Sequence, residues 1–299
     1  NWWGNFTSVK KKGFDIGKNF FLSFSPERLD PGIKNILLKD IPKITGGVTK
    51  ECLKISASVY GKVHKKIIKV SDTQTAEATK LLENVYRAVN IGLVNELKML
   101  TDKLDLDIYE IIRAASTKPF GFVPFYPGPG LGGHCIPIDP YYLAWKGDQV
   151  GVNTKFIKLA GQVNTSIPYI IVKKIKMILK NIKKIHPKIL VLGVAYKKNV
   201  NDLRESPGIK IINLLKKEKI LVSFSDPFIS MIPKLRNSDL KMKSVEIKSK
   251  NLKFFDLIVI VADHDRFNYN LIYKSSNLIL DTRGVYKTDK QNKVINKFV

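Results

Sequence analysis

The sequence predicts an α/β protein in which a small N-terminal α/β region precedes a long-helix region and a C-terminal parallel-sheet domain. Three observations support this fold class. Short apolar strand runs alternate with helical stretches, the longest regular pattern covers about residues 74–103, and a strand, helix, strand, strand order follows residue 188. At 299 residues the chain is long enough for two hydrophobic cores. We place the domain boundaries at 1–72, 73–168 and 169–299.

The N-terminal region contains candidate strands at 19–25, 44–47 and 67–71, with a helix at about 49–62. The first strand runs into Pro26-Glu27-Arg28-Leu29-Asp30-Pro31-Gly32, a loop at a strand's carboxyl end, where open α/β sheets bind ligands. Glu27 and Arg28 are therefore candidate site residues. The alternative is an exposed, salt-bridged turn.

The predicted helix at 74–103 carries an apolar stripe, made of Leu81, Leu82, Val85, Ala88, Val89 and Leu93. Thirty helical residues span about 45 Å, enough to bridge two domains and to pack against a second subunit. Lys80, Asn84 and Arg87 follow one another at helical spacing and share a face. They could hold an oxyanion or a sugar phosphate, or they could be a solvated polar face.

Further helices are expected at about 107–116, 140–146, 156–164, 169–185 and 208–217, and further strands at 188–193, 220–225, 254–262 and 278–281. This order predicts a Rossmann-type parallel sheet. Its first turn lacks the dinucleotide fingerprint, because Gly193 is followed by a charged loop without a further glycine before Pro207. We expect a nucleotide binder of another kind, with four side chains at strand ends facing one crevice: Tyr196, Lys197, Arg204 and Arg283.

A glycine-rich stretch from Tyr126 to Pro140 contains one of only two cysteines, Cys135. Its four glycines let the backbone approach a ligand closely. Cys135 is a candidate nucleophile, since a reactive thiolate needs a polar, partly open site. The alternative is a structural loop with a buried thiol. Cys52, the other cysteine, is expected to be a small core residue.

His134, Cys135 and Asp139 do not make a convincing zinc site, because the other histidines are isolated and no Cys-x-x-Cys occurs. A Cys-His hydrolase is also disfavoured, since adjacent residues usually point apart. We expect no metal.

The formal net charge of +25 suggests nucleic-acid binding. However, the excess is nearly all lysine scattered through every element, with only seven arginines. We therefore expect no nucleic-acid partner, although a positive surface would steer an anionic substrate. No apolar run approaches a membrane span and no secretory signal is seen. With two cysteines, the composition predicts a reducing, cytoplasmic location.

Four ordered motifs resemble nucleotide-sugar 6-dehydrogenases of the UDP-glucose/GDP-mannose family, and the resemblance extends from about Gly13 to Arg283. The motifs are S-P-E-R-L-D-P-G, A-E-A-T-K-L-L-E-N-V-Y-R-A-V-N-I-G-L-V-N-E-L, G-P-G-L-G-G-H-C-I-P-I-D-P and L-G-V-A-Y-K-K-N-V-N-D-L-R-E-S-P. The branch acting on UDP-N-acetylglucosamine or UDP-N-acetylmannosamine is the most similar. The resemblance implies NAD-dependent oxidation of the sugar C6 hydroxyl to a carboxylate, for surface polysaccharide precursors, in a homodimer formed through the 74–103 helix.

The resemblance also implies residue roles. Cys135 would be the nucleophile, Lys80 and Asn84 the oxyanion partners, and Asp139 and Glu27 the residues that act through water. The implied substrate contacts are Arg28, Leu29, Arg87, Lys118, Phe125, Tyr126, Gly132, Tyr196, Lys197 and Arg283. The implied NAD contacts are Glu27, Gly133, Cys135 and Arg204.

The NAD-binding half of the family, with its glycine fingerprint, is not found in this sequence, and residue 1 is Asn. We therefore expect a fragment or a truncated gene product, in which residues 1–72 are the remnant of that domain. The alternative function is a non-catalytic UDP-sugar-binding or dimerising remnant.

Overall fold

The computed structural model describes residues 13–29, 36–235, 239–286 and 293–299. The chain divides into two compact units, Asn1–Asn84 and Val85–Val299. The features expected at 1–12 and at Asp30–Gly32 lie outside the described residues.

The first unit contains a three-stranded sheet in the order β1-β2-β3. Strand β1 (Ser23–Phe24) is antiparallel to β2 (Lys43–Gly47), and β2 is parallel to β3 (Ile67–Val70). Helix α2 (Lys50–Tyr60) connects β2 to β3, so these elements form a βαβ unit. A short 3-10 helix, η1, covers Leu38–Asp40.

The predicted strand at 19–25 is reduced to two residues because the chain before it turns back on itself. The carbonyl of Asp15 accepts the N–H groups of Lys18, Asn19 and Phe20. Helix α2 begins where expected, since the Thr49 side chain caps it by accepting from the Cys52 N–H. Cys52 is 1% exposed, which confirms it as a core residue.

Helix α3 (Thr73–Lys103) begins in the first unit and continues into the second. Its apolar residues are divided between two faces, which differs from the single predicted stripe. Leu81 and Ala88 are buried, whereas Leu82 is 66% and Leu93 is 53% exposed. The helix therefore has one packed face and one apolar face open to solvent.

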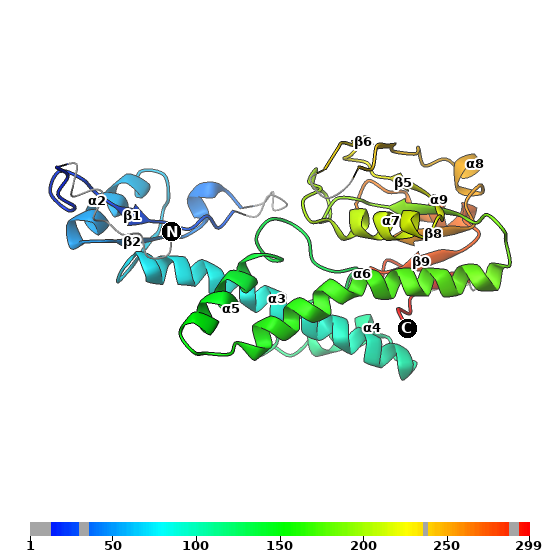
Figure 1. Ribbon diagram of the computed structural model, residues 1–299, viewed down its shortest axis with the longest axis horizontal. Coiled ribbons are helices and arrows are strands. Elements are labelled where there is room, and N and C mark those ends of the chain that lie inside the picture. Colours follow the sequence, from blue (N-terminus) through cyan, green and yellow to red (C-terminus); the bar gives the residue numbers. More distant parts are fainter. Residues whose placement is uncertain (1–12, 30–35, 236–238, 287–292) are drawn as a thin grey trace. The chain divides into compact units, whose positions relative to one another are not determined.

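Three more helices belong to the second unit: α4 (Ile108–Ala115), α5 (Asp139–Gln149) and α6 (Lys155–Ile182). Helix α6 is a single 28-residue helix, the long green helix of Figure 1, where the sequence predicted two. Pro168 lies inside this helix, although proline lacks the N–H that continues a helix. The helix continues through it because Ile167, Ile171 and Ile175 are fully buried on one face.

The second unit also contains the predicted parallel sheet, in the order β10-β9-β8-β4-β5. Its strands are β4 (Lys188–Leu192), β5 (Leu221–Ser225), β8 (Leu257–Ile260), β9 (Ile279–Asp281) and β10 (Val294–Ile295). All neighbouring pairs are parallel. Such an order places a topological switch between β4 and β8, where doubly wound folds bind ligands.

Alternating residues of the strands face two separate cores. In β4, Ile189 and Val191 pack with residues of α6 and of α7 (Pro207–Lys217). Leu190 and Leu192 point the other way, toward α8 (Ser249–Leu252) and α9 (Tyr269–Ser275). Helices therefore cover both faces of the sheet. A hairpin of β6 (Met231–Ile232) and β7 (Met242–Lys243) lies beside β5, where Phe224 of β5 bridges Ser244.

Among the described residues, no helix combines the length and apolar character needed to cross a membrane.

Candidate functional site

The glycine-rich stretch packs directly against the carboxyl end of the parallel sheet. A Cβ on Gly128 would come within 2.3 Å of an Arg283 guanidinium nitrogen, just after β9. A Cβ on Gly132 would come within 2.6 Å of the Cβ of Tyr196, in the loop after β4. The N–H of Gly133 donates to the Arg204 carbonyl at 2.9 Å. Glycine is required at 132, because a side chain there would collide with the Tyr196 Cβ and the Glu205 carbonyl, whereas at 128 the flexible end of Arg283 could move aside.

A chain of buried amides holds this stretch from the side of the helices. The N–H of Gly128 donates to Asn95 Oδ1 at 3.0 Å. Asn95 Nδ2 donates to Asn164 Oδ1 at 3.0 Å, and Asn164 Nδ2 donates to the Ala88 carbonyl at 2.9 Å. Asn95 is fully buried and Asn164 is 3% exposed. The amides therefore join α3, α6 and the glycine-rich stretch without leaving a buried polar atom unpaired.

Cys135 is partly exposed in the turn that leads into α5. Its carbonyl accepts the N–H groups of Ile138 (3.0 Å) and Asp139 (2.8 Å), and Asp139 is the first residue of the helix. Its Sγ lies 3.8 Å from His134 Nδ1. The thiol is thus held by a fixed backbone turn but remains accessible, which excludes the alternative of a buried structural thiol.

Arg204 belongs to the surroundings of Cys135. Its Nε and Nη2 groups donate to the Asp202 carboxylate at 2.6 to 3.1 Å. The pKa of the guanidinium is raised, first by this carboxylate and less by Tyr196 and Cys135. The pKa of Asp202 is lowered: its partial burial acts in the opposite sense, but the bonds from Arg204 outweigh it. The predicted cofactor contact is therefore a paired, exposed arginine near the thiol.

The turn after β4 is already filled by a carboxylate of the protein itself. Asp226 Oδ2 accepts the N–H groups of Val194 (2.8 Å) and Ala195 (3.1 Å), and the side chain is fully buried. These are the positions at which a dinucleotide-binding turn would present its amides to a pyrophosphate. The sheet of the second unit is thus unsuited to a dinucleotide at this turn, as the missing glycines predicted.

Arg283 and Tyr196 both lie against the glycine-rich stretch, and this brings together two of the four side chains expected at strand ends. Arg283 Nε donates to Asp263 Oδ1 at 3.0 Å, and its backbone N–H donates to Asp281 Oδ1 at 2.9 Å. Lys197 is the neighbour of Tyr196 and is partly buried. The carboxyl edge of the sheet therefore presents cationic side chains beside an open thiol loop.

In the first unit, Glu27 is built into a compact polar cluster. Its Oε1 accepts the N–H groups of Arg28 (2.9 Å) and Leu29 (2.7 Å), and its Oε2 lies 3.4 Å from Lys43 Nζ. Desolvation opposes ionisation, but the backbone bond from Leu29 and the charge of Lys43 lower the pKa of Glu27. The carboxylate side chain remains 63% exposed. It is thus ionised and open to a ligand.

Arg28 is held by two partners within the first unit. Its Nη1 donates to the Pro42 carbonyl at 2.9 Å, and its Nη2 lies 2.7 Å from Glu83 Oε1 on α3. Together with Leu29, these residues line a surface pocket. The salt-bridged turn that the sequence left open as an alternative is present, and it fixes the guanidinium at the rim of a pocket.

Lys80, Asn84 and Arg87 lie on α3 at the predicted spacing. Asn84 is 2% exposed and Lys80 is partly buried, whereas Arg87 is exposed. A fully solvated polar face is therefore wrong for Asn84. Lys80 and Asn84 belong to the first unit with Glu27, and Arg87 belongs to the second unit with Cys135.

The aromatic loop before the glycine-rich stretch contains three further predicted contacts. Phe125 packs edge-on against Tyr86 with ring centroids 5.7 Å apart, and it covers the small core of α3 and α4. Lys118 is exposed, with its Nζ 5.1 Å from the Phe120 ring centroid. Tyr126 is 46% exposed. Phe125 thus packs on this core while part of its surface stays open, and Lys118 and Tyr126 are available at the surface.

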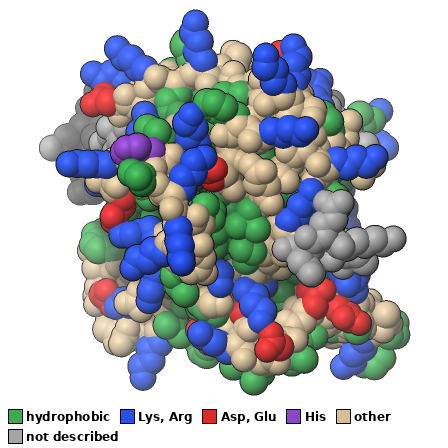
Figure 2. Space-filling view, turned by 90° about the vertical axis from the view of Figure 1, so that its right-hand side faces the viewer, with side chains coloured by type: hydrophobic (Ala, Val, Ile, Leu, Met, Phe, Trp, Pro, Cys, Tyr) green, Lys and Arg blue, Asp and Glu red, His purple; other side chains and the backbone are tan. Residues whose placement is uncertain are grey.

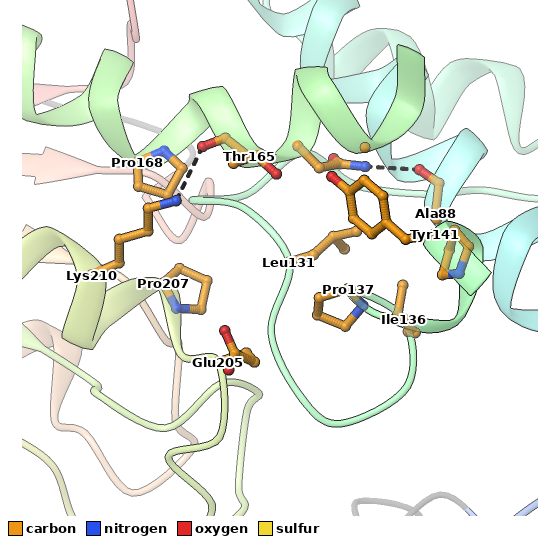
Figure 3. A pocket seen from close by; sticks show the side chains of 13 residues that line it. Ala88, Leu131, Ile136, Pro137, Tyr141, Thr165, Pro168, Glu205, Pro207 and Lys210 are labelled. Carbon is orange, nitrogen blue, oxygen red and sulfur yellow. Dashed lines mark hydrogen bonds between the residues drawn. The ribbon is translucent and has the colours of Figure 1, made fainter. Parts of the chain in front are cut away.

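A cavity of about 190 Å³ lies behind the thiol loop. Figure 3 shows Leu131, Ile136 and Pro137 of the loop facing Thr165 and Pro168 of α6, with α7 closing the remaining side. Lys210 Nζ reaches the Thr165 carbonyl at 3.5 Å. The apolar wall on one side of this cavity is therefore made by the residues that flank Cys135.

Lysine and arginine side chains do not gather in one stripe on the face shown in Figure 2, where they are spread out with acidic residues among them. No group of three metal-ligating side chains occurs within the described ranges.

Two family models match the chain: the UDP-glucose/GDP-mannose dehydrogenase family central domain over residues 74–166, and the UDP binding domain of the same family over residues 190–288. Together they cover more than half of the chain. The chain belongs to the UDP-glucose/GDP-mannose dehydrogenase family. The resemblance inferred from the four motifs is thereby confirmed, as is the Rossmann-like fold class.

Among individual members of this family, Protein CapL of Staphylococcus aureus is 35% identical over 292 residues, which cover 95% of this chain and 67% of CapL. The UDP-N-acetyl-D-mannosamine dehydrogenase of Methanococcus vannielii is 34% identical, with 90% of this chain and 62% of that protein covered. The structure of the UDP-D-ManNAc dehydrogenase of Pyrococcus horikoshii superposes with a TM-score of 0.82 at 30% identity, covering 97% of this chain and 68% of that one. The chain thus spans about two thirds of the length of these relatives.

Sequence reasoning missed three residues that position the site: Lys43, Asn95 and Asn164. Lys43 is a lysine inside a buried strand, and the asparagines lie on the packed faces of their helices. A polar residue at an apolar position of a periodic pattern is the signal that could have found them.

Proposed function

We propose that this chain carries the nucleophile and the nucleotide-binding part of a UDP-N-acetylhexosamine 6-dehydrogenase. The observation that supports this most directly is the packing of the Cys135 loop on the strand ends of the domain that matches the UDP binding model, through Gly128 and Arg283 and through Gly132 and Tyr196. A nucleotide held at this edge brings its sugar to an accessible thiol. The Methanococcus vannielii relative is named a UDP-N-acetyl-D-mannosamine dehydrogenase, and a relative from Pseudomonas aeruginosa is named a UDP-N-acetyl-D-glucosamine 6-dehydrogenase.

Four electrons leave the C6 carbon in two steps. Removal of a proton and a hydride converts the alcohol to an aldehyde, and the Cys135 thiolate then adds to the aldehyde carbon to form a thiohemiacetal. Loss of a second hydride gives a thioester, and water releases the carboxylate and the thiol. Covalent catalysis of this kind splits one difficult oxidation into two easier steps. The product is a uronic acid, which suits surface polysaccharide precursors.

The residues of the first unit serve the proton and oxyanion steps. Lys80 and Asn84, one helical turn apart, stabilise the oxyanion, and Lys80 also carries the proton. The ionised, exposed carboxylate of Glu27 orders the active-site water, and Asp139 of the second unit assists through a water. Arg28, Leu29, Arg87, Lys118 and Tyr126 contact the substrate.

Tyr196, Lys197 and Arg283 hold the nucleotide half. The guanidinium of Arg283 is fixed by Asp263 and lies on the glycine-rich stretch, so it meets a phosphate or uracil oxygen at low entropic cost. Anionic UDP is also attracted by the net positive charge of the chain.

NAD is the proposed cofactor, and when bound it accepts the hydrides. The residues proposed to contact NAD are Glu27, Gly133, Cys135 and Arg204. The glycine-rich loop leaves room for the nicotinamide ring beside the accessible thiol. No cradle for its phosphates is found within the described residues of the second unit, since Asp226 occupies the turn after β4.

We further propose a homodimer through the open face of α3. Apolar side chains recur along that face at coiled-coil spacing, and each is at least 37% exposed: Tyr86, Leu93, Leu97 and Leu100, followed by Leu104 just beyond the helix end. A second copy of the same helix has the pattern needed to cover them.

Incubation of the full-length protein that contains this chain with UDP-N-acetylmannosamine or UDP-N-acetylglucosamine and NAD tests the dehydrogenase directly. We expect NADH formation that Cys135→Ser abolishes and that Cys52→Ala, a change at the buried cysteine, leaves in place. No NADH from either sugar, or equal turnover in Cys135→Ser, contradicts the proposal.

A second candidate is a UDP-sugar-binding or dimerising chain without catalysis, since Asp226 of the protein itself fills the turn after β4. Calorimetry separates the two functions. Binding of UDP without binding of NAD supports this candidate, whereas NAD binding at ordinary affinity excludes it.

A further inference from the structure

His264 is a fully buried histidine whose two ring nitrogens are both occupied. Its Nδ1 accepts the backbone N–H of Asn199 at 2.9 Å, and its Nε2 lies 3.1 Å from Asp226 Oδ2. A nitrogen that accepts from an amide carries no proton, so the proton is on Nε2 and is donated to the carboxylate. The hydrogen-bond partners therefore define one neutral tautomer.

The imidazole is also fixed in orientation by its neighbours. The Phe228 and Phe267 rings lie 5.1 and 5.6 Å from it, centroid to centroid. The Tyr269 hydroxyl donates to the His264 carbonyl at 3.0 Å. A ring packed in this way cannot turn to find other partners, so its Nδ1 lone pair points at the Asn199 amide.

Asn199 lies at the tip of the loop that carries the proposed UDP contacts. The base of this loop is closed by Ser206 Oγ, which donates to the Val194 carbonyl at 2.6 Å, and by Tyr196 N–H, which donates to the Asp202 carbonyl at 2.9 Å. Two residues, Asn199 and Lys198, join the tip of the loop to the segment that follows β8. Asn199 exchanges two bonds with Asp265, and Lys198 Nζ lies 2.6 Å from Asp265 Oδ1.

The bond to His264 differs from the bonds to Asp265 in its surroundings. Asp265 is exposed, so water can replace its contacts, whereas the Asn199–His264 bond is shielded by a side chain with 0% exposure. Asn199 also adopts a φ of +59°, a left-handed conformation that asparagine adopts more readily than most residues. Its backbone N–H is held at this position by the buried His264 Nδ1.

We propose that His264 is a positioning residue for nucleotide binding: through Nδ1 it holds the tip of loop 196–204, and through Nε2 and Asp226 it ties that tip to the Val194 and Ala195 amides at the loop's base. The loop then presents Tyr196 and Lys197 at a fixed distance from the glycine-rich stretch. This inference rests on the proposed UDP site.

Two substitutions separate the roles of the two nitrogens. In His264→Asn the amide oxygen can take the place of Nδ1 and accept from Asn199, but the donor to Asp226 is lost. In His264→Gln the amide nitrogen can take the place of Nε2, but the acceptor for Asn199 is lost. Ser275→Ala is the matched control, because it removes a partly buried hydrogen bond to Ser249 in the same domain, away from the loop.

The experiment measures UDP affinity by calorimetry and amide hydrogen exchange of residues 196–204 in the full 299-residue chain. We expect His264→Gln to weaken UDP binding about tenfold and to speed exchange in the loop. His264→Asn should stay within about threefold of the original chain in affinity, although it lowers the melting temperature. Ser275→Ala should lower the melting temperature without changing either loop measurement.

Equal affinity and equal loop exchange in His264→Gln and the original chain overturn the proposal and leave His264 a purely structural residue. Equal loss in the Asn and Gln variants also overturns it, because Nδ1 would then have no special role. If the original chain takes up no UDP, the proposed function fails, and loop exchange alone decides whether His264 holds the loop.

Discussion

Asn95 Oδ1, deep on the packed side of α3, accepts the N–H of Gly128 at 3.0 Å. This bond connects the long helix to the stretch that carries the thiol. Because Asn164 in turn holds the Asn95 amide, neither group can adjust alone.

Asn95→Ala should lower the free energy of unfolding by about 1–3 kcal/mol, because it leaves the Gly128 N–H and the Asn164 oxygen buried without partners. Urea unfolding followed by circular dichroism measures the loss. Asn90→Ala on the same helix is the control, since its side chain bonds only a nearby carbonyl at the surface, and we expect a change below about 0.5 kcal/mol. Similar losses in both variants would contradict a special role for Asn95.

Gly132→Ala should disturb the site more than Gly121→Ala. The added Cβ at 132 meets the Tyr196 Cβ at 2.6 Å and the Glu205 carbonyl at 2.9 Å, so the loop must move away from the sheet. A Cβ at Gly121 meets nothing, and only its φ of +71° is unfavourable, at a cost of about 1 kcal/mol. UDP affinity by calorimetry should fall at least tenfold in the first variant only. Unchanged affinity in Gly132→Ala would show that the contact with Tyr196 does not matter for binding.

Asp226→Asn should destabilise the chain in a manner that depends on pH. Burial alone would raise the pKa of Asp226, but the bonds from His264, Phe228 and Val194 outweigh it and lower the pKa. Because the pKa of Asp226 is lower in the folded state, its ionised form stabilises the fold at pH values above the unfolded pKa of about 3.9. This contribution to stability disappears as the pH falls through the folded-state pKa. At pH 7 we expect a loss of about 2–3 kcal/mol, since the new amide N–H groups face two backbone donors.

The measurement for Asp226 is the difference in unfolding free energy between the original chain and Asp226→Asn across pH 7 to 2. The other carboxylates titrate in both chains and cancel. The difference should be constant above about pH 5 and shrink below about pH 4. A difference that grows on acidification would reverse the assigned direction of the shift.

Asp102→Ala should cost about 3–5 kcal/mol of unfolding free energy. Asp102 is 4% exposed, pairs with the buried ammonium of Lys98, and accepts the Phe298 N–H at 2.6 Å. Removing it leaves a buried charge without its partner. The double change Lys98→Met with Asp102→Leu should cost less than the single change, and thermal unfolding compares the two. A larger loss in the double variant would mean that packing, not charge, dominates.

Leu100→Glu should prevent the proposed dimer, because it places a charge in the centre of the open α3 face, where Leu100 is 54% exposed. Light scattering after size exclusion should show half the molar mass of the original chain. Ile185→Glu is the matched control, since Ile185 is 87% exposed beyond the end of α6 and should not change the mass. A monomeric original chain, or a dimer that survives Leu100→Glu, would contradict dimerisation through α3.

The sequence by itself determined the four main strands of the parallel sheet, the helices α2, α3 and α4, and the family, because each depends on local patterns. The runs of branched apolar residues at 188–192 and 257–260 can only be buried strands. The glycine-rich stretch with Cys135 identified the candidate nucleophile, because glycine spacing and residue type are visible in one dimension.

Only the tertiary structure decided where buried polar residues find partners. Pro168 predicts a helix end locally, but three fully buried isoleucines on one face keep α6 continuous. Asn95, Asn164 and Asp226 look like ordinary polar residues until the fold brings partners from 31 or more positions away along the chain. Local sequence propensity cannot predict such contacts, because a buried amide or carboxylate is stable only when another segment of the chain supplies its hydrogen bonds.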